Sequence, residues 1–394
     1  MTGEGTRAVH AGLPAAAPGQ PLVPGPVFAA PYHLDPVGGP RPGIDGYGRT
    51  DNPTFRMLEA AVADLEGAAG CVVFSSGMAA LSAVLFGLLR PGDTVMLPAD
   101  GYYQTRSVAA ARLAPLGIRI VEAPTAGPYP PFDGVRLVLL ESPANPGLDV
   151  CDVAALSRAA HAAGALVAVD NTAATPLGQR PLDLGADISV ASGTKALTGH
   201  SDMLLGYVCA RDPEVVASML GWRSATGAIP GAFEAWLAHR SLSTLDLRLA
   251  RQSQTAHAVA EALSARADVT AVRFPGLPTD PSHDVAAAQM RRVPGIVTFT
   301  LPSRERVAAF LRAARLVAAA TSFGGIHTSA DRREQWGDPV APGLVRLSCG
   351  IEDTDDVVAD VTRALDRAAL DHAALDDRGL DAPGPATHGH TTVA

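Results

Sequence analysis

The order of apolar and helical segments between residues 54 and 210 narrows the possible folds of this chain more than any other feature. Stretches of helical length and periodicity alternate with short apolar runs: CVVF (71–74), TVMLPA (94–99), RLVLLES (136–142), LVAVD (166–170) and ISVAS (188–192). Strands that alternate with helices in this way build βαβ units, and continuous apolar runs are typical of strands buried on both faces. The sequence therefore predicts an α/β protein with a mainly parallel sheet covered by helices.

The chain divides into four segments. Residues 1–46 are rich in proline and glycine without a sustained period, which predicts an extended arm. Residues 47–243 hold the alternating pattern and form the predicted large domain. The pattern then changes to a long helix over 245–264 followed by short strands, which predicts a smaller α+β domain over 244–374. The polar residues 375–394 are expected to form a disordered tail.

Composition limits the partners and the compartment. The formal net charge of −9 argues against a nucleic acid or an anionic membrane, because both require a basic surface. The chain has neither a signal-peptide core nor an apolar run of about 18 residues. Cys71, Cys151, Cys209 and Cys349 form no C-x-x-C pair, which argues against a zinc site or a dense disulfide framework. We therefore expect a cytoplasmic protein with a small-molecule partner and no bound metal.

Chemically reactive residues follow the predicted strands, at the sheet edge where open parallel sheets bind ligands. LVAVD ends on Asp170, and a carboxylate among apolar neighbours requires a partner. CVVF leads into SSGM (75–78), where backbone N–H groups at a helix start can hold a phosphate. ISVAS leads to Lys195 among small residues, and Ser192 and Thr194 can add hydroxyls to the same anion.

Each of these features alone has a simpler interpretation: a surface lysine, a helix cap, or a small-residue turn that only packs. Together they match pyridoxal phosphate, which needs a lysine for its imine, an acid to keep the ring nitrogen protonated, and a phosphate cradle. Small neighbours around Lys195 would leave room for the planar cofactor and its substrate. The sequence thus predicts an enzyme that depends on pyridoxal phosphate.

Longer motifs lead to a known family. They are YGRTDNPT (47–54), VFSSGMAA (73–80), ESPANPG (141–147), VAVDNTAATPLGQRPLDLGADISVASGTKALTGHSD (167–202) and VRLSCGIED (345–353). With these motifs the chain, from about residue 10 to 367, resembles the Cys/Met-metabolism enzymes of pyridoxal phosphate fold type I. That family includes cystathionine γ-lyases, cystathionine γ-synthases and methionine γ-lyases. The resemblance implies an aspartate-aminotransferase-like fold with a seven-stranded sheet in the large domain.

The resemblance also implies a role for each candidate site residue. Those that would contact the cofactor are Lys195 at the imine, Asp170 at the ring nitrogen, Gly77, Met78, Ser192 and Thr194 at the phosphate, Tyr102 stacked on the ring, and Asn145 near the ring's 3-oxygen.

Further implied roles concern the substrate and a neighbouring subunit. Arg346 would clamp the substrate α-carboxylate, and Asn145, Thr321 and Ser322 would also line the substrate site. Tyr47 and Arg49 would reach the phosphate of a neighbouring subunit. We therefore expect a homodimer, usually paired into a homotetramer, with active sites shared across the dimer interface.

The reaction expected from the resemblance is a γ-elimination. Lys195 would remove the Cα proton, Tyr102 would assist proton movement, and a γ-substituent would leave after a second deprotonation at Cβ. A cystathionine γ-lyase would convert cystathionine into cysteine, 2-oxobutanoate and ammonia.

The substrate-side motifs depart from the family pattern. TSFGG (321–325) stands where many cystathionine enzymes have Glu-Ser-Leu-Gly-Gly, so an acid that could bind the distal ammonium of cystathionine is missing. HTSADRREQWGD (327–338) and Tyr103-Gln104 also differ from the commoner residues.

Two alternatives to a cystathionine γ-lyase therefore stay open. One is a relative that acts on methionine, on an O-acyl-homoserine by γ-replacement, or on an unusual amino acid, even a halogenated one, in specialised metabolism. The other is a catalytically silent cofactor-binding or scaffold protein, against which the presence of Lys195, Asp170, Tyr102 and Arg346 argues.

Overall fold

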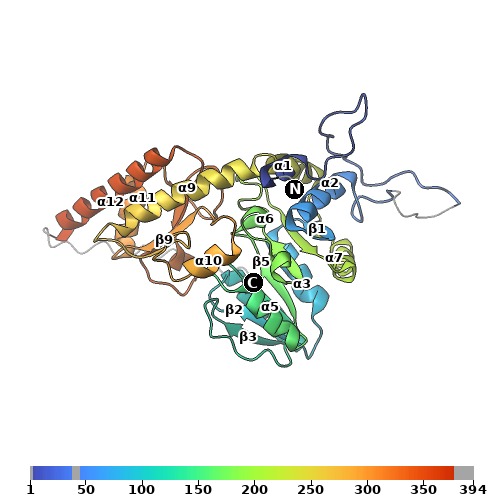
Figure 1. Cartoon of the computed structure of the whole chain (residues 1–394), viewed down its shortest axis with the longest axis horizontal. Helices are drawn as coiled ribbons and strands as arrows, with labels where there is room; N and C mark the ends of the chain where they lie inside the picture. Colours follow the sequence, from blue (N-terminus) through green and yellow to red (C-terminus); the bar gives the residue numbers. More distant parts are fainter. Residues whose placement is uncertain (1–2, 38–44, 377–394) are drawn as a thin grey trace, which may run out of the picture.

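The computed structural model describes residues 3–37 and 45–376 and places them in two units that lie side by side (Figure 1). The large unit holds a wide sheet with helices on both faces, and the small unit holds a second sheet packed against long helices. Helix α9 (Leu245–Ser264) runs between the two units. The predicted division into a large and a smaller domain agrees with this arrangement.

The sheet of the large unit has seven strands in the order β1-β7-β6-β5-β4-β2-β3. Strand β7 is antiparallel to both of its neighbours, and the other pairs are parallel. This confirms the predicted seven-stranded, mainly parallel sheet. The strands are β1 (Gly70–Phe74), β2 (Thr94–Pro98), β3 (Arg119–Ala123), β4 (Leu137–Glu141), β5 (Leu166–Asp170), β6 (Ile188–Ala191) and β7 (Gly206–Ala210).

Helices cover both faces of this sheet because its strands alternate buried side chains between two apolar clusters. On one face Leu139 packs in the cluster that contains α3 and α7, and on the other Val138 packs against α5. The helical elements of this unit are α2 (Pro53–Glu66), α3 (Gly77–Leu88), α4 (Tyr103–Val108), η1 (Ala109–Leu113), η2 (Ala114–Leu116), α5 (Val153–Ala162), α6 (Thr175–Gly178), η3 (Pro181–Leu184), α7 (Pro213–Thr226) and α8 (Ala232–Leu242).

The small unit is built on a five-stranded sheet in the order β10-β11-β12-β9-β8, antiparallel except for the pair β10-β11. Its α+β character agrees with the prediction. Its strands are β8 (Thr270–Arg273), β9 (Ile296–Thr300), β10 (Ala318–Ala319), β11 (Ser329–Arg332) and β12 (Leu344–Ser348). Its other helical elements are α10 (His283–Gln289), α11 (Arg304–Ala313), η4 (Arg333–Trp336) and α12 (Thr354–Asp376).

The structure refines the predicted segment boundaries. Helix α9 begins in the core of the large unit, where Leu245 and Leu249 are buried, and ends in the core of the small unit with Val259 and Leu263. Helix α9, which begins two residues after the predicted boundary at 243, thus belongs to both cores.

The N-terminal arm is not extended throughout. Helix α1 (Glu4–His10) packs on the large unit, with Ala8 buried in its core and Arg180 Nη2 2.5 Å from Glu4 Oε2. A helix of seven residues with one buried side chain has no period that sequence analysis can detect. At the other end α12 continues to Asp376, and the rest of the predicted tail lies outside the described residues.

All four cysteines are buried and none is paired in a disulfide. Over the ranges that the structure describes, we find no helix with the length and apolar content needed to cross a membrane.

Candidate active site

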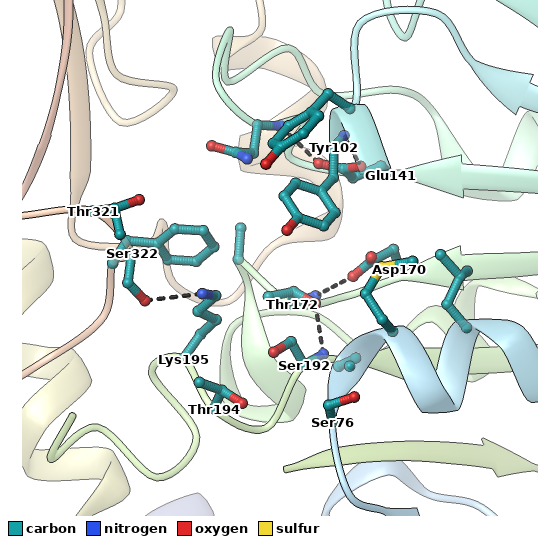
Figure 2. Close-up of a pocket in the computed structure, with 18 of the residues that line it drawn as sticks. Ser76, Tyr102, Glu141, Asp170, Thr172, Ser192, Thr194, Lys195, Thr321 and Ser322 are labelled. Carbon is teal, nitrogen blue, oxygen red and sulfur yellow. Dashed lines mark hydrogen bonds between the residues drawn. The ribbon is translucent and has the colours of Figure 1, made fainter. Parts of the chain in front are cut away.

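A cavity of about 350 Å³ lies beyond the carboxyl ends of β1, β4, β5 and β6, where the small unit closes over the sheet. Its position and volume are those expected for a ligand site in an open α/β sheet. Figure 2 shows side chains from both units meeting around it. The structure brings these predicted site residues together in its lining: Gly77, Met78, Tyr102, Asn145, Asp170, Ser192, Thr194, Lys195, Thr321, Ser322 and Arg346.

Lys195 is the only lysine in the 394 residues. It lies shortly after β6, and its Nζ donates a hydrogen bond of 2.9 Å to Ser322 Oγ of the small unit. Burial, followed by the positive charges of Arg346 and Arg333, lowers the pKa of Lys195 to about 8. A substantial fraction of this amine is therefore neutral near physiological pH, which a nucleophile or general base requires.

Two carboxyls, one buried and one partly buried, lie side by side at the ends of neighbouring strands. Glu141 of β4 and Asp170 of β5 are partners in the parallel register. Asp170 accepts a 2.9 Å hydrogen bond from the backbone N–H of Thr172. Burial raises the pKa of both carboxyls, and the charge of Asp170 raises the pKa of Glu141 further. A cationic ligand atom beside Asp170 would stabilise its ionised form.

Glu141 holds two loops of the site. Its Oε2 accepts the backbone N–H of Tyr102 at 2.7 Å, and its Oε1 accepts that of Asn145 at 2.8 Å. The side chain therefore fixes where Tyr102 enters the cavity (Figure 2). The sequence contained a signal for Glu141, since it is an acidic residue at the end of an apolar run, as Asp170 is.

The N-terminus of α3 faces the loop that follows β6. Ser76 caps the helix by accepting the backbone N–H of Ala79 at 3.1 Å. A Cβ on Gly77 would lie 2.5 Å from Cβ of Ser192, so only glycine allows this approach. Ser192 is held in turn by a 2.8 Å hydrogen bond from its backbone N–H to Thr172 Oγ1. The first N–H groups of a helix lack intrahelical acceptors and attract anions.

The Thr194 hydroxyl already has backbone partners. It donates to the carbonyl of Leu205 at 3.1 Å and accepts the N–H of the same residue at 2.9 Å. Because a hydroxyl has one proton to donate, a hydrogen bond from Thr194 to a phosphate requires it to leave the carbonyl of Leu205. Its role at a phosphate stays a prediction.

Arg346 of β12 reaches the cavity from the small unit. Its Nη1 donates to Asn145 Oδ1 at 2.5 Å and its Nη2 to the carbonyl of Ser322 at 2.9 Å. Its Nε is buried and has no hydrogen-bond partner among the residues that the structure describes. Burial lowers the pKa of Arg346 to about 10. Because this value is still well above 7, the guanidinium is charged at neutral pH. The unpartnered donor of this cation suits a carboxylate ligand.

Ser322 and Phe323 connect the amine and the guanidinium. Ser322 has a left-handed backbone (φ 79°), which is costly for a residue other than glycine and is often found at functional sites. The Phe323 ring centroid lies 5.4 Å from Lys195 Nζ and 5.1 Å from Arg346 Cζ. Both cations thus lie within cation–π distance of the same aromatic ring.

These features fit the predicted pyridoxal phosphate. The partly buried carboxyl of Asp170 needs a cationic partner, which a protonated ring nitrogen would provide. Gly77 and Ser192 line the cavity at the start of α3, where the first backbone N–H groups attract an anion. The single lysine is on the same cavity wall, and its neutral form is accessible at physiological pH.

Tyr47 and Arg49 lie outside the cavity of their own chain. The Tyr47 side chain is 49% exposed, and the Arg49 guanidinium lies 5.4 Å from its ring centroid and donates to the carbonyl of Ser224. Their expected contact with a neighbouring subunit stays a prediction.

Sequence reasoning missed other residues of the cavity besides Glu141. Arg333 and Trp336 belong to the stretch 327–338, which the sequence marked only as a departure from a family pattern. Thr172 follows Asp170 by two residues, and its position in the motif was the available signal. Phe323 lies inside the TSFGG stretch, but nothing in the sequence indicates that its ring contacts both cations.

Comparison with known proteins finds relatives along nearly the whole chain. The family model described as Cys/Met metabolism PLP-dependent enzyme matches residues 37–366. A Streptomyces coelicolor protein provisionally named cystathionine γ-lyase is 57% identical over 373 residues, which is 92% of this chain and 94% of the relative.

Two solved structures have the same architecture. Cystathionine γ-synthase from Xanthomonas oryzae pv. oryzae, in complex with cystathionine, gives a TM-score of 0.89 at 35% identity, covering 94% of this chain and 99% of that one. Apo CalE6, a methionine γ-lyase from Micromonospora echinospora, gives a TM-score of 0.86 at 38% identity, covering 92% and 99%. These likenesses confirm the predicted fold.

Proposed function

The chain belongs to the Cys/Met metabolism PLP-dependent enzymes, and on this basis we propose that it catalyses γ-elimination, with cystathionine as its substrate. One water is consumed, and the products are cysteine, 2-oxobutanoate and ammonia. The observation that carries the proposal is the meeting, in one cavity, of the only lysine, the carboxyl of Asp170 and an arginine with an unpartnered donor.

In this proposal the cofactor is held by residues of the large unit. Lys195 would form the covalent attachment, Asp170 would pair with the ring nitrogen, and the first backbone N–H groups of α3 would bind the phosphate beside Gly77 and Ser192. Tyr102, whose backbone N–H donates to Glu141, would stack on the ring. When bound, pyridoxal phosphate withdraws the electrons that remain after protons leave carbon atoms of the substrate.

Lys195 is the proposed proton carrier. Its lowered pKa makes a neutral Nζ available, which would accept the Cα proton of the substrate. In the chain without cofactor, its Nζ donates a hydrogen bond of 2.9 Å to Ser322 Oγ. Tyr102, half buried on the opposite wall, is placed to assist proton movement to or from the leaving group.

Arg346 is the proposed anchor for the substrate α-carboxylate. Asn145 and Ser322 fix two of its nitrogens, and its Nε stays available. Such preorganisation orients the Cα–H bond toward the base without a rearrangement of the guanidinium.

A second candidate substrate class is favoured by Thr321. This residue lines the cavity at the position where many cystathionine enzymes carry an acid, so it offers no charge to the distal ammonium of cystathionine. Elimination from methionine or from another γ-substituted amino acid, or γ-replacement on an O-acyl-homoserine, uses the same cofactor and the same base.

A substrate panel tests the proposal. The purified protein loaded with pyridoxal phosphate is incubated with cystathionine, methionine, O-succinylhomoserine and a γ-chlorinated amino acid, and the 2-oxo acid, ammonia and released group are measured by mass spectrometry. We expect the highest kcat/KM with cystathionine. Intact cystathionine beside turnover of another compound would assign the second class, and no turnover of any compound would leave only a silent cofactor-binding protein.

We also propose a dimeric or tetrameric assembly in the cytoplasm. Apolar side chains of the arm are strongly exposed in the single chain, with Leu22 89%, Phe28 74% and Val37 93% accessible, which favours a neighbouring subunit as their cover. The same cover would bring Tyr47 and Arg49 toward the cavity of that neighbour. The four unpaired cysteines fit a reducing compartment.

A further inference from the structure

The segment that departs from the family pattern contains a carboxylate directly behind Arg346. Asp331 lies on β11 opposite Arg346 on β12, and the two residues are partners in the antiparallel register. Side chains of such partners extend from the same face of the sheet at close distance. The ion pair between them therefore follows from the strand pairing.

The Asp331 carboxylate accepts from three side chains. Its distances are 3.3 Å to Arg346 Nη2, 2.9 Å to Arg333 Nη1 and 3.0 Å to the indole nitrogen of Trp336. Asp331, Arg346 and Arg333 are each 3% exposed, whereas Trp336 is 41% exposed and lines the cavity. One buried side chain thus contacts both a candidate substrate-binding residue and part of the cavity wall.

Arg333 stabilises this carboxylate instead of offering a second free cation. Its Nε donates to Asp338 Oδ2 at 2.8 Å while its Nη1 donates to Asp331. Both acids are buried, and the formal charges of the two arginines and two aspartates balance. Within this cluster Arg346 is the arginine with an unpartnered buried Nε.

We propose that Asp331 is the positioning residue of the substrate end of the site, holding the Arg346 guanidinium for the substrate α-carboxylate and the Trp336 indole as part of the cavity wall. The inference rests on the proposed function in one respect, the role of Arg346. If the proposal holds, recognition of the substrate carboxylate and the shape of the cavity wall both depend on Asp331, because Arg346 and Trp336 share its carboxylate oxygens.

Asp331→Asn tests the proposal, because asparagine keeps the shape but loses the charge and one acceptor. Binding is measured from the change in visible absorbance when cofactor-loaded protein is titrated with L-alanine, which has no γ-substituent to eliminate, and with L-alaninamide, which lacks the carboxylate. We expect alanine binding to weaken about tenfold, as for loss of a charged hydrogen-bond partner, and alaninamide binding to change less than about twofold.

Asp360→Asn is the matched control. Asp360 is also a buried aspartate of the small unit, and it accepts the backbone N–H groups of Arg315 and Leu316, but it does not line the cavity. We expect this variant to lower the melting temperature without changing the preference for alanine over alaninamide. Equal losses of stability in the two variants, with the preference unchanged in both, would overturn the proposal.

Acrylamide quenching of tryptophan fluorescence tests the contact between Asp331 and Trp336. The part due to Trp336 is the difference between each protein and its Trp336→Phe counterpart. We expect this part to be quenched more strongly after Asp331→Asn, because the indole loses its anchor, and to stay unchanged after Asp360→Asn. Unchanged quenching in Asp331→Asn would contradict the proposed anchoring of the wall.

Arg346→Lys separates this inference from the proposed function. If Arg346→Lys leaves the preference for alanine over alaninamide unchanged, the carboxylate anchor itself is wrong. If Arg346→Lys lowers the preference and Asp331→Asn does not, only the positioning role of Asp331 fails.

Discussion

Lys195 has the surroundings of a reactive amine, and the chain holds no other lysine that could take its place. Its partly buried Nζ lies beside Ser322 and the Phe323 ring and in the field of Arg346 and Arg333. Burial and like charges both disfavour the ammonium form. The same two causes predict how the amine responds to pH.

We expect Lys195 of the cofactor-free protein to be half reactive toward a small N-hydroxysuccinimide ester near pH 8, and not near its ordinary value of 10.5. Only the neutral amine reacts, so the rate falls as pH decreases through this pKa. Mass spectrometry of peptides separates Lys195 from the α-amino group, the other amine of the chain. Removing one positive charge with Arg346→Met is expected to raise the midpoint, and a native midpoint above pH 10 would refute the low pKa.

At this scale the sequence predicted residues whose chemistry is visible in a strand-end pattern. Lys195 and Asp170 stand out because polar groups follow apolar runs. Glu141 is also a polar group at the end of an apolar run, but this pattern alone does not show that its carboxylate holds two loops of the site. Arg333 and Trp336 could not be predicted, because their link to Arg346 depends on the pairing of β11 with β12.

Among the elements, the junction of α3 with the loop after β6 determines whether an anion can bind. Gly77 allows the helix start to approach Ser192, and its N–H groups then face the cavity. A side chain at this position would push the two elements apart. The junction can therefore be tested by a single methyl group.

We expect Gly77→Ala to weaken pyridoxal phosphate binding about tenfold or more, since overpacking a tight contact typically costs about 1–3 kcal/mol. Binding is measured by titrating the cofactor-free protein and following the visible absorbance. Gly221→Ala is the control, because a Cβ there meets no atom within 4 Å and the position lies inside α7. That variant should bind the cofactor normally and gain about 0.5–1 kcal/mol of stability. Equal cofactor affinity in both variants would contradict the cradle.

Elements with a strong period were predicted well, and short ones were not. The helix over 245–264 has the bounds of α9, because its buried face persists for twenty residues. Helix α1 is held by ion pairs and one buried alanine, which leave no pattern in the sequence. The domain boundary was also invisible, because α9 is buried in one core at its start and in the other at its end.

For the whole molecule, the open question of assembly concerns the arm and the loop that carries Tyr47 and Arg49. In the single chain these side chains lie away from the cavity, on the surface. The two units together supply the other predicted site residues. A subunit interface is therefore the remaining way for Tyr47 and Arg49 to reach a cofactor.

Mixing two inactive variants tests this expectation. Lys195→Ala and Arg49→Ala are dissociated, mixed in equal amounts and reassembled. If each site takes Lys195 from one subunit and Arg49 from the other, random pairing should restore about a quarter of native activity, because half of the dimers are mixed and each has one intact site. Mixed dimers that recover no activity would show that the sites are not shared in this way.

The overall architecture was predictable because both units are encoded by repeated local patterns, and the family motifs are spread over nearly the whole chain. The substrate could not be predicted in this way. It depends on side chains such as Thr321 and Trp336, which differ from the family pattern and do not by themselves indicate which substrate group they contact. The central claim, γ-elimination driven by Lys195, thus needs a direct chemical test.

That test is to incubate the cofactor-loaded native protein and its Lys195→Ala variant with L-cystathionine in D₂O and to follow both reactions by NMR. We expect the native protein to form cysteine and 2-oxobutanoate in equal amounts, with deuterium at carbons that have gained solvent protons, and the variant to form neither. Unchanged cystathionine with the native protein, or equal product formation by the variant, would contradict the account.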